Sequence, residues 1–299
     1  MRPKIYAKSL LSIPEAEVKR QIGCDGIEIQ LFDEFLDDKF KYDVNDFNYP
    51  VTVVHCPILN GEGINLEDLL IPERAMLIQK SMKLANDFGI KQNKNILVVI
   101  HTSKSIEFIK REGDYEKILD LIAGLLKQYP KTILAIENVT PIKFDSNNNP
   151  ILCNGFYDDN VAWAKAINTI LPNRAGTVLD VCHAGITKMQ LQHIPQLFDL
   201  PNKGMFSLSN YFRINKDLCV LIHLASFEGC GYGKGKHGIT FTEDTADKCN
   251  MVLFLYDNYG YKCPITLEIW ENDYMVCDGY RQTKEIVDKY LWYSDVLKR

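Results

Sequence analysis

Short apolar runs recur along the whole chain and predict its secondary structure. Eight of them are rich in β-branched residues: 4–8, 26–31, 51–56, 96–101, 133–137, 177–181, 219–224 and 265–270. Most run on without alternation between apolar and polar positions, which is typical of parallel strands covered on both faces. The pattern therefore predicts eight buried parallel strands.

Helical patterns fill most of the gaps between these runs. The expected helices are 15–22, 115–129, 159–171, 245–259 and 281–298. Start signals such as Ser12 and Asp114 precede them, whereas the acidic and aromatic segment 33–48 has no clear helical period. Strand and helix alternate without a linker rich in Pro, Gly or Ser, which predicts an α/β fold, a single (β/α)₈ TIM barrel over residues 1–299. A doubly wound open sheet is the alternative architecture.

Length and composition agree with this fold. A chain of 299 residues is normal for a closed α/β barrel, which needs roughly 250 residues. Hydrophobic residues make up 46% of the chain and charged residues 24%, so enough apolar side chains are present for a large core. These values argue against disorder.

Charge and cysteine content narrow the partners and the compartment. The net charge is −5 and no run of five Lys or Arg occurs, so the overall charge does not favour binding to nucleic acid. A local basic groove on an acidic protein could still bind it. The nine cysteines include no C-x-x-C pair, and several lie in apolar runs, as reduced core cysteines do. The first residues, Met1 to Tyr6, include no apolar stretch of signal-peptide length, and no later window reaches 18 uncharged apolar residues. We expect a soluble cytoplasmic protein without a membrane partner.

Six of the predicted strands end in a residue that can bind a metal ion. These residues are His55, His101, Glu137, Asp180, His223 and Glu268. In a barrel the carboxyl ends of the strands face one pocket, where the active site lies. Carboxylates and imidazoles are costly to bury unless something pairs with them, so their repetition predicts a metal site at this end of the barrel.

The donor types restrict the metal. Carboxylates and imidazoles without thiolates suit a divalent ion such as Zn²⁺, Mn²⁺, Co²⁺ or Mg²⁺. Glu137, Asp180, His223 and Glu268 alone make a four-ligand site. His55 and His101 could bind a second ion that shares Glu137, or they could hydrogen-bond a substrate. One ion is expected, with two as the alternative.

A glycine-rich segment, residues 229–238, follows the seventh strand. It contains G-x-G-x-x-G at 233–238, but the motif neither abuts the strand nor opens a helix, as a dinucleotide-binding motif would. We expect a mobile active-site loop whose amides, with Lys234 and Lys236, hold an anion over the pocket, while His237 serves as a ligand or proton donor. A solvated flexible loop is the alternative.

With these residues the chain resembles the xylose isomerase-like TIM barrel superfamily. Its sugar isomerases and epimerases hold one divalent ion by a glutamate, an aspartate, a histidine and a glutamate from strands five to eight. By this resemblance the ligands here are Glu137, Asp180, His223 and Glu268. The resemblance further implies that Glu137 and Glu268 act as acid and base and that His183 holds a substrate oxygen. The basic glycine loop would then suit a sugar phosphate.

The chain also resembles the family-2, endonuclease IV-like apurinic endonucleases of the same superfamily. The matching segments are Val54-His55-Cys56-Pro57, Ile100-His101, Ala135-Ile136-Glu137-Asn138 and Asp180-Val181-Cys182-His183-Ala184. Those enzymes bind three zinc ions and cleave DNA beside an abasic site, and His237 could match their last histidine. The seventh strand departs from the family, because Ala225-Ser226 replaces Asn-Asp and Gly235 stands where an aspartate ligand is expected.

We therefore expect a divalent-metal-dependent sugar or sugar-phosphate isomerase or epimerase acting on a small carbohydrate. An endonuclease IV-like zinc-dependent phosphodiester hydrolase is the alternative, and DNA is a partner only in that case. A non-catalytic ligand-binding barrel is a third possibility. The sequence leaves the substrate, the metal and the oligomeric state open.

Overall fold

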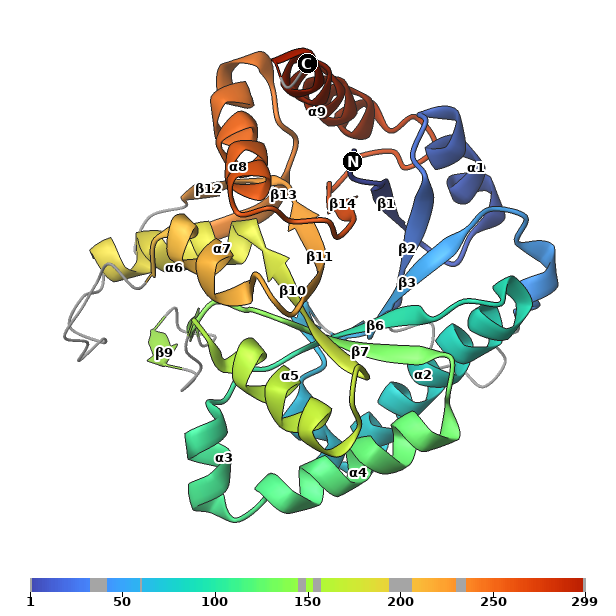
Figure 1. Cartoon of the computed structure of the whole chain (residues 1–299), viewed down its shortest axis with the longest axis vertical. Coiled ribbons are helices and arrows are strands. Elements are labelled where there is room, and N and C mark those ends of the chain that lie inside the picture. The colour runs from blue at the N-terminus through green and yellow to red at the C-terminus, as the bar shows by residue number, and fades with distance from the viewer. Residues whose placement is uncertain are drawn as a thin grey trace.

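Eight parallel strands form a closed barrel in the computed structural model, as the apolar runs predict (Figure 1). The structure describes residues 2–32, 42–59, 61–144, 149–152, 157–193, 206–229 and 235–297. The barrel strands are β1 (Ile5–Ser9), β2 (Gly26–Gln30), β3 (Val51–His55), β6 (Ile96–His101), β7 (Thr132–Glu137), β10 (Ala175–Asp180), β11 (Cys219–Leu224) and β14 (Ile265–Leu267). Neighbours pair in the order β1-β14-β11-β10-β7-β6-β3-β2, so β2 closes on β1. The prediction of a (β/α)₈ barrel is confirmed, and the open sheet is excluded.

Helices surround the strands (Figure 1). They are α1 (Ile13–Gln21), α2 (Pro72–Gln92), α3 (Ile106–Glu112), α4 (Tyr115–Gln128), α5 (Asp159–Ile170), α6 (Val181–His193), α7 (Leu208–Asn215), α8 (Ala246–Asn258) and α9 (Asp278–Leu297). The five expected helices are all present, within three residues of their predicted limits. The Ser12 hydroxyl caps α1 by accepting from the backbone N–H of Glu15, as predicted, whereas Asp114 makes no such bond to α4. In the described part of the chain no helix is both long and apolar enough to cross a bilayer.

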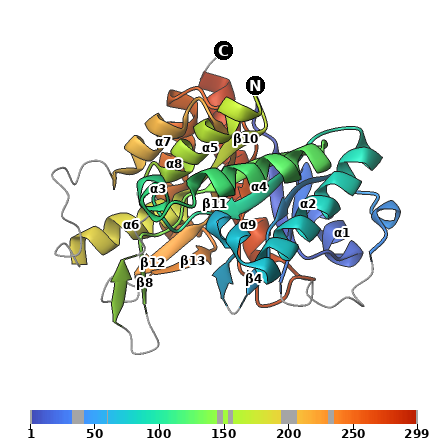
Figure 2. The same cartoon turned by 90° about the horizontal axis from the view of Figure 1, so that it is seen from below.

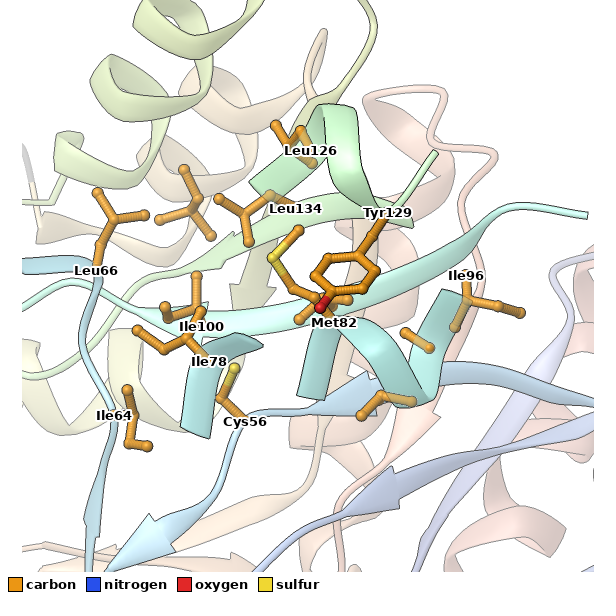
Figure 3. Packing of buried hydrophobic residues seen from close by; sticks show 14 of the residues in the cluster. Cys56, Ile64, Leu66, Ile78, Met82, Ile96, Ile100, Leu126, Tyr129 and Leu134 are labelled. Atoms are coloured by element: carbon orange, nitrogen blue, oxygen red, sulfur yellow. The ribbon is translucent and has the colours of Figure 1, made fainter. Parts of the chain in front are cut away.

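The main apolar cores lie between the barrel and its helices. On α4, Ile118, Leu119, Ile122 and Leu126 recur at helical spacing and are buried, which gives this helix one apolar face. Figure 3 shows side chains of α2 such as Met82 packed with residues of β6 and β7 in one such cluster. Burial of this apolar surface, at about 25 cal/mol per Å², holds the helices on the barrel and leaves the strand ends free to carry polar groups.

A smaller apolar layer fills the inside of the barrel and sets the position of the site. It contains Tyr6, Val53, Val99, Ala135, Val178 and Leu221, one from each of six strands. Side chains two residues apart in a strand point to the same face. The residues two positions after the last five members of this layer are His55, His101, Glu137, Asp180 and His223. The backbone period therefore directs all five into the barrel at its carboxyl end.

Three antiparallel hairpins extend beyond the carboxyl ends of the strands. They are β4 (Ile58–Leu59) with β5 (Glu62–Gly63), β8 (Ile142–Phe144) with β9 (Pro150–Leu152), and β12 (Ser226–Gly229) with β13 (Gly235–Ile239). Figure 2 shows β4, β8, β12 and β13 on one side of the molecule. A mobile loop is expected over 229–238, but Gly229 and residues 235–238 belong to the paired strands of the third hairpin, so these described residues form regular structure. Residues 230–234 lie outside the described part.

Candidate metal centre

The six predicted ligands converge at the carboxyl end of the barrel in two groups. Glu137, Asp180, His223 and Glu268 form one group, and His55, His101 and Glu137 form the other; the donor atoms within each group lie within 4.8 Å of one another. Glu137 belongs to both. His55, His101, Glu137 and Glu268 line a pocket of about 520 Å³. The structure therefore brings together every residue that the strand-end pattern selected as a ligand.

His223 is held so that one ring nitrogen faces the carboxylates. Its Nε2 donates to Glu28 Oε2 at 3.0 Å, which leaves Nδ1 as the atom available to a metal ion. Nδ1 lies 3.1 Å from Glu268 Oε2, 3.3 Å from Glu137 Oε1 and 3.9 Å from Asp180 Oδ2. Burial alone would lower the pKa of His223, but Glu28, Glu137 and Glu268 outweigh it and raise that pKa well above its usual range. Oxygens of Glu137, Asp180 and Glu268 thus lie around Nδ1 of His223, and their negative charge favours a cation at this place.

Asp180 is fixed by the backbone around it. The Asn138 side chain bonds the Asp180 backbone in both directions, accepting from its N–H at 2.8 Å and donating to its carbonyl at 3.0 Å. Asp180 Oδ1 accepts from the backbone N–H of His183 at 2.6 Å, so Oδ2 faces the group. Burial, reinforced by Glu268 and Glu137, raises the pKa of Asp180 well above its usual range. A divalent ion would remove this penalty by stabilising the carboxylate.

The second group carries an independent sign of a cation. His55 Nδ1 lies 2.7 Å from the carbonyl of Cys56, which can only accept, so Nδ1 carries the hydrogen. Burial, with the nearby charge of Lys8, lowers the pKa of His55, so its ring is neutral at pH 7. Nε2 then presents a lone pair to Glu137 Oε2 at 3.3 Å, and His101 Nε2 lies 3.4 Å from the same oxygen. Facing acceptors of this kind fit a shared metal ion, because donors about 2.1 Å from a tetrahedral ion lie about 3.4 Å apart.

Two charged residues of the site were not among the predicted ligands. Lys8 on β1 places Nζ 2.5 Å from Glu268 Oε1 and 3.7 Å from Glu28 Oε1. Glu28 on β2 is fully buried. Two sequence signals could have found them: Lys8 stands two residues after Tyr6 of the inner layer, and Glu28 alternates with buried Ile27 and Ile29.

Charge balance in this space also points to a cation. Glu28, Glu137, Asp180 and Glu268 are four buried carboxyl groups, and among the described residues the cations that ion pairs join to them are the Lys8 ammonium group and His223, whose pKa these carboxylates raise. Four carboxylates therefore exceed two cations. Buried charges of one sign destabilise a fold unless they are compensated. The donor set, the facing lone pairs and this excess of negative charge together fit a divalent metal ion.

The four predicted substrate-binding residues are placed differently from one another. His183 and His237 line the pocket with ring centroids 5.1 Å apart, and burial lowers the pKa of His183 to about 4 and also lowers that of His237. Lys236 is exposed and does not line this pocket, because alternation along β13 points it away from the face that carries His237. Lys234 lies outside the described residues.

Comparison with known proteins agrees with the fold. A family model described as the xylose isomerase-like TIM barrel matches residues 17–291. The solved structure of the IolI protein with a bound zinc atom superposes with a TM-score of 0.61 at 12% identity, covering 96% of this chain and 98% of that one. The 3-keto-D-glucoside 4-epimerase of E. coli gives 0.57 at 13% identity, covering 96% and 100%. A D-tagatose 3-epimerase-like protein gives 0.59 at 16%, covering 99% and 100%.

These identities show a shared fold and no more. A search of curated protein sequences found no significant match.

Proposed function

Because the chain belongs to the xylose isomerase-like TIM barrel family, we propose that it is a divalent-metal-dependent sugar isomerase or epimerase acting on a small carbohydrate. The observation that carries the proposal is the group of Glu137, Asp180 and Glu268 around Nδ1 of His223. Bound there, a divalent ion would polarise a carbonyl and the adjacent hydroxyl, which acidifies the C–H bond beside the carbonyl. Solved structures of epimerases share the fold, which makes this chemistry the first one to test.

Glu137 and Glu268 are suited to move the proton. Burial alone would raise the pKa of both, but His223 and His101 lower the pKa of Glu137, and Lys8 and His223 lower that of Glu268. Both are therefore anionic at neutral pH, and an anionic carboxylate can accept a proton from carbon. We propose that one glutamate removes the proton and that the other, after protonation from solvent, returns one on the opposite face.

His183 is suited to hold a substrate oxygen. Its Nε2 lies 3.8 Å from Glu137 Oε1, and its buried Nδ1 has no hydrogen-bond partner among the residues that the structure describes. Because burial lowers its pKa to about 4, the ring is neutral and offers one donor and one acceptor. A substrate hydroxyl beside these two atoms would accept from His183 Nε2 and donate to Glu137 Oε1.

The proposal is tested by turnover in D₂O. Protein loaded in turn with Mn²⁺, Co²⁺, Mg²⁺ or Zn²⁺ is incubated with a panel of ketoses, aldoses and their phosphates, and the products are followed by NMR. We expect an isomer or epimer that carries deuterium at the reacting carbon, because the donor glutamate is protonated from solvent. Glu268→Gln should abolish this product, and Glu243→Gln, on the exposed turn Glu243–Thr245, should not. Turnover by Glu268→Gln would refute the assignment.

A zinc-dependent phosphodiester hydrolase acting on DNA is the second candidate. The row of imidazoles favours it, since His55, His101, His183 and His237 follow one another with centroids 5.1 to 6.2 Å apart. Such a row suits several zinc ions. Gly235, however, offers no ligand where that branch has an aspartate, and Lys236 faces away from the pocket. Cleavage of an abasic-site oligonucleotide, with three zinc ions per chain, would favour this candidate over the first.

A further inference from the structure

A second cavity adjoins the metal centre. Its volume is about 290 Å³, and it shares Ile58 and Glu268 with the 520 Å³ pocket. The ends of β1, β2 and β14 and the segments that follow them supply most of its walls. Its apolar lining includes Leu10, Phe32, Ile269, Trp270, Tyr274 and Tyr280. It is therefore an apolar compartment beside the candidate catalytic carboxylate.

Trp270 forms the wall between this cavity and the hairpin that carries His237. Its ring lies edge-on to Phe32 and to His237, with centroids 6.5 Å away in each case. Its backbone N–H donates to the carbonyl of Gly238 at 2.8 Å. Gly238 has a φ of +75°, and a Cβ at that position would lie 1.7 Å from Trp270 Cδ1. The glycine thus allows the indole to pack tightly against the hairpin, which fixes this wall.

Gln30 in the lining carries a buried polar atom without a hydrogen-bond partner among the described residues. Gln30 is 6% exposed, and its Nε2 donates to the carbonyls of Leu31 at 2.9 Å and Cys56 at 3.5 Å. Carbonyls can only accept, so the amide orientation is determined and Oε1 is the free acceptor. No donor of the described residues reaches Oε1. Two other polar groups of the lining are engaged, because Lys8 pairs with Glu268 Oε1 and the Tyr280 hydroxyl donates to the Lys8 carbonyl at 3.0 Å.

We infer that the substrate of the metal centre carries an apolar ring, aromatic or alicyclic, joined to the carbohydrate through a polar link, and that this ring occupies the 290 Å³ cavity. The carbohydrate half of this inference rests on the proposed function. An unsubstituted sugar in this cavity would lose hydrogen bonds to water without replacing them, whereas an apolar ring gains by leaving water. The volume suits one substituted six-membered ring, since an apolar cavity of about 150 Å³ holds benzene. Gln30 Oε1 would accept from a hydroxyl of the ligand.

The cavity is tested first without any sugar. Benzyl alcohol, which combines one ring with one hydroxyl, is titrated into the 299-residue chain and followed by ligand-observed NMR. Leu10→Trp fills the cavity from a residue that is 40% exposed, and Leu121→Trp on α4 is the matched control at 39% exposure. We expect binding to wild type and to Leu121→Trp, and at least tenfold weaker binding to Leu10→Trp. No binding to wild type, or equal binding to Leu10→Trp, overturns the inference.

The link to the carbohydrate is tested with paired glycosides. Phenyl and methyl glycosides of glucose, galactose, mannose and xylose are titrated into the Mn²⁺-loaded protein by calorimetry. We expect at least one phenyl glycoside to bind tenfold or more tightly than its methyl counterpart, and the ratio to approach one in Leu10→Trp. Equal affinities, or no phenyl glycoside bound by a protein that binds benzyl alcohol, overturn the linked substrate. These glycosides have no free carbonyl and therefore cannot turn over, so the titration tests the linked substrate alone. Selective binding together with no deuterium incorporation in the D₂O experiment would instead refute the proposed function.

Discussion

Replacing Glu28 by Gln should weaken metal binding although Glu28 is not itself a proposed ligand. Glu28 is fully buried, and its Oε2 accepts from His223 Nε2 at 3.0 Å, which keeps Nδ1 directed at the carboxylates. The amide retains the shape but loses the charge, and its NH₂ can donate to Nε2, which would move the ring hydrogen to Nδ1 and block the metal. Substitutions of such partners typically cost 10- to 100-fold in metal affinity, or about 1.4 to 2.7 kcal/mol.

The assay is competition with a chromogenic chelator at pH 7.5, using Mn²⁺ and Zn²⁺ in turn. Glu15→Gln is the matched control, because Glu15 is also buried and accepts from the backbone N–H of Leu10 at 3.0 Å, but contacts no proposed ligand. We expect Glu15→Gln to bind metal as wild type does. Unchanged metal affinity in Glu28→Gln would refute the argument that Glu28 orients His223.

The remaining predictions concern protons, charge and packing. The carboxylates around His223 outweigh burial and raise its pKa, so a metal ion must displace the proton on Nδ1. Metal affinity should therefore fall as pH decreases, and calorimetry in buffers of different ionisation enthalpy should show proton release. Heats of binding that do not depend on the buffer would contradict this. Lys8→Met removes the ammonium group that pairs with the buried carboxylates of Glu28 and Glu268. The free energy of unfolding measured in urea should therefore fall by about 3 kcal/mol. An unchanged free energy of unfolding would mean that these two ion pairs do not stabilise the fold. Gly63→Ala would put a Cβ 2.1 Å from His101 Nδ1 and should weaken binding of a second metal ion, whereas Gly124→Ala, which meets nothing within 4 Å, should not.

The sequence predicts the barrel and its ligands for one physical reason. Parallel strands covered on both faces are continuous apolar runs, and a polar residue at the end of such a run must face either solvent or a site. That argument selects Glu137 and His223 without any tertiary information. It misses Lys8, which ends the run 4–8, because an ammonium group does not bind a metal ion. It misses Glu28 because this residue lies inside the run 26–31 and not at its end. The two-residue period of β1 and β2 would have included both.

Other features depend on contacts that are distant in sequence. Pairing of β13 with β12 directs His237 toward the pocket and Lys236 away from it. The composition of the glycine-rich segment does not predict these two directions. The apolar cavity is assembled by Leu10, Phe32 and Trp270, which follow three different strands. None of them is unusual in its local sequence. Only closure of the barrel, which places β1 between β2 and β14, brings these three residues to one place.

The central claim is that Glu137, Asp180, His223 and Glu268 form a divalent metal centre. The most direct test is the number of metal ions per chain, measured by mass spectrometry after loading and extensive dialysis, in wild type and in Asp180→Asn. The structure predicts at least one tightly bound ion in the wild type and its loss in the variant, with one ion favouring the isomerase or epimerase and three zinc ions favouring the hydrolase. A wild-type protein that retains no metal, or a variant that retains as much as wild type, would contradict the claim.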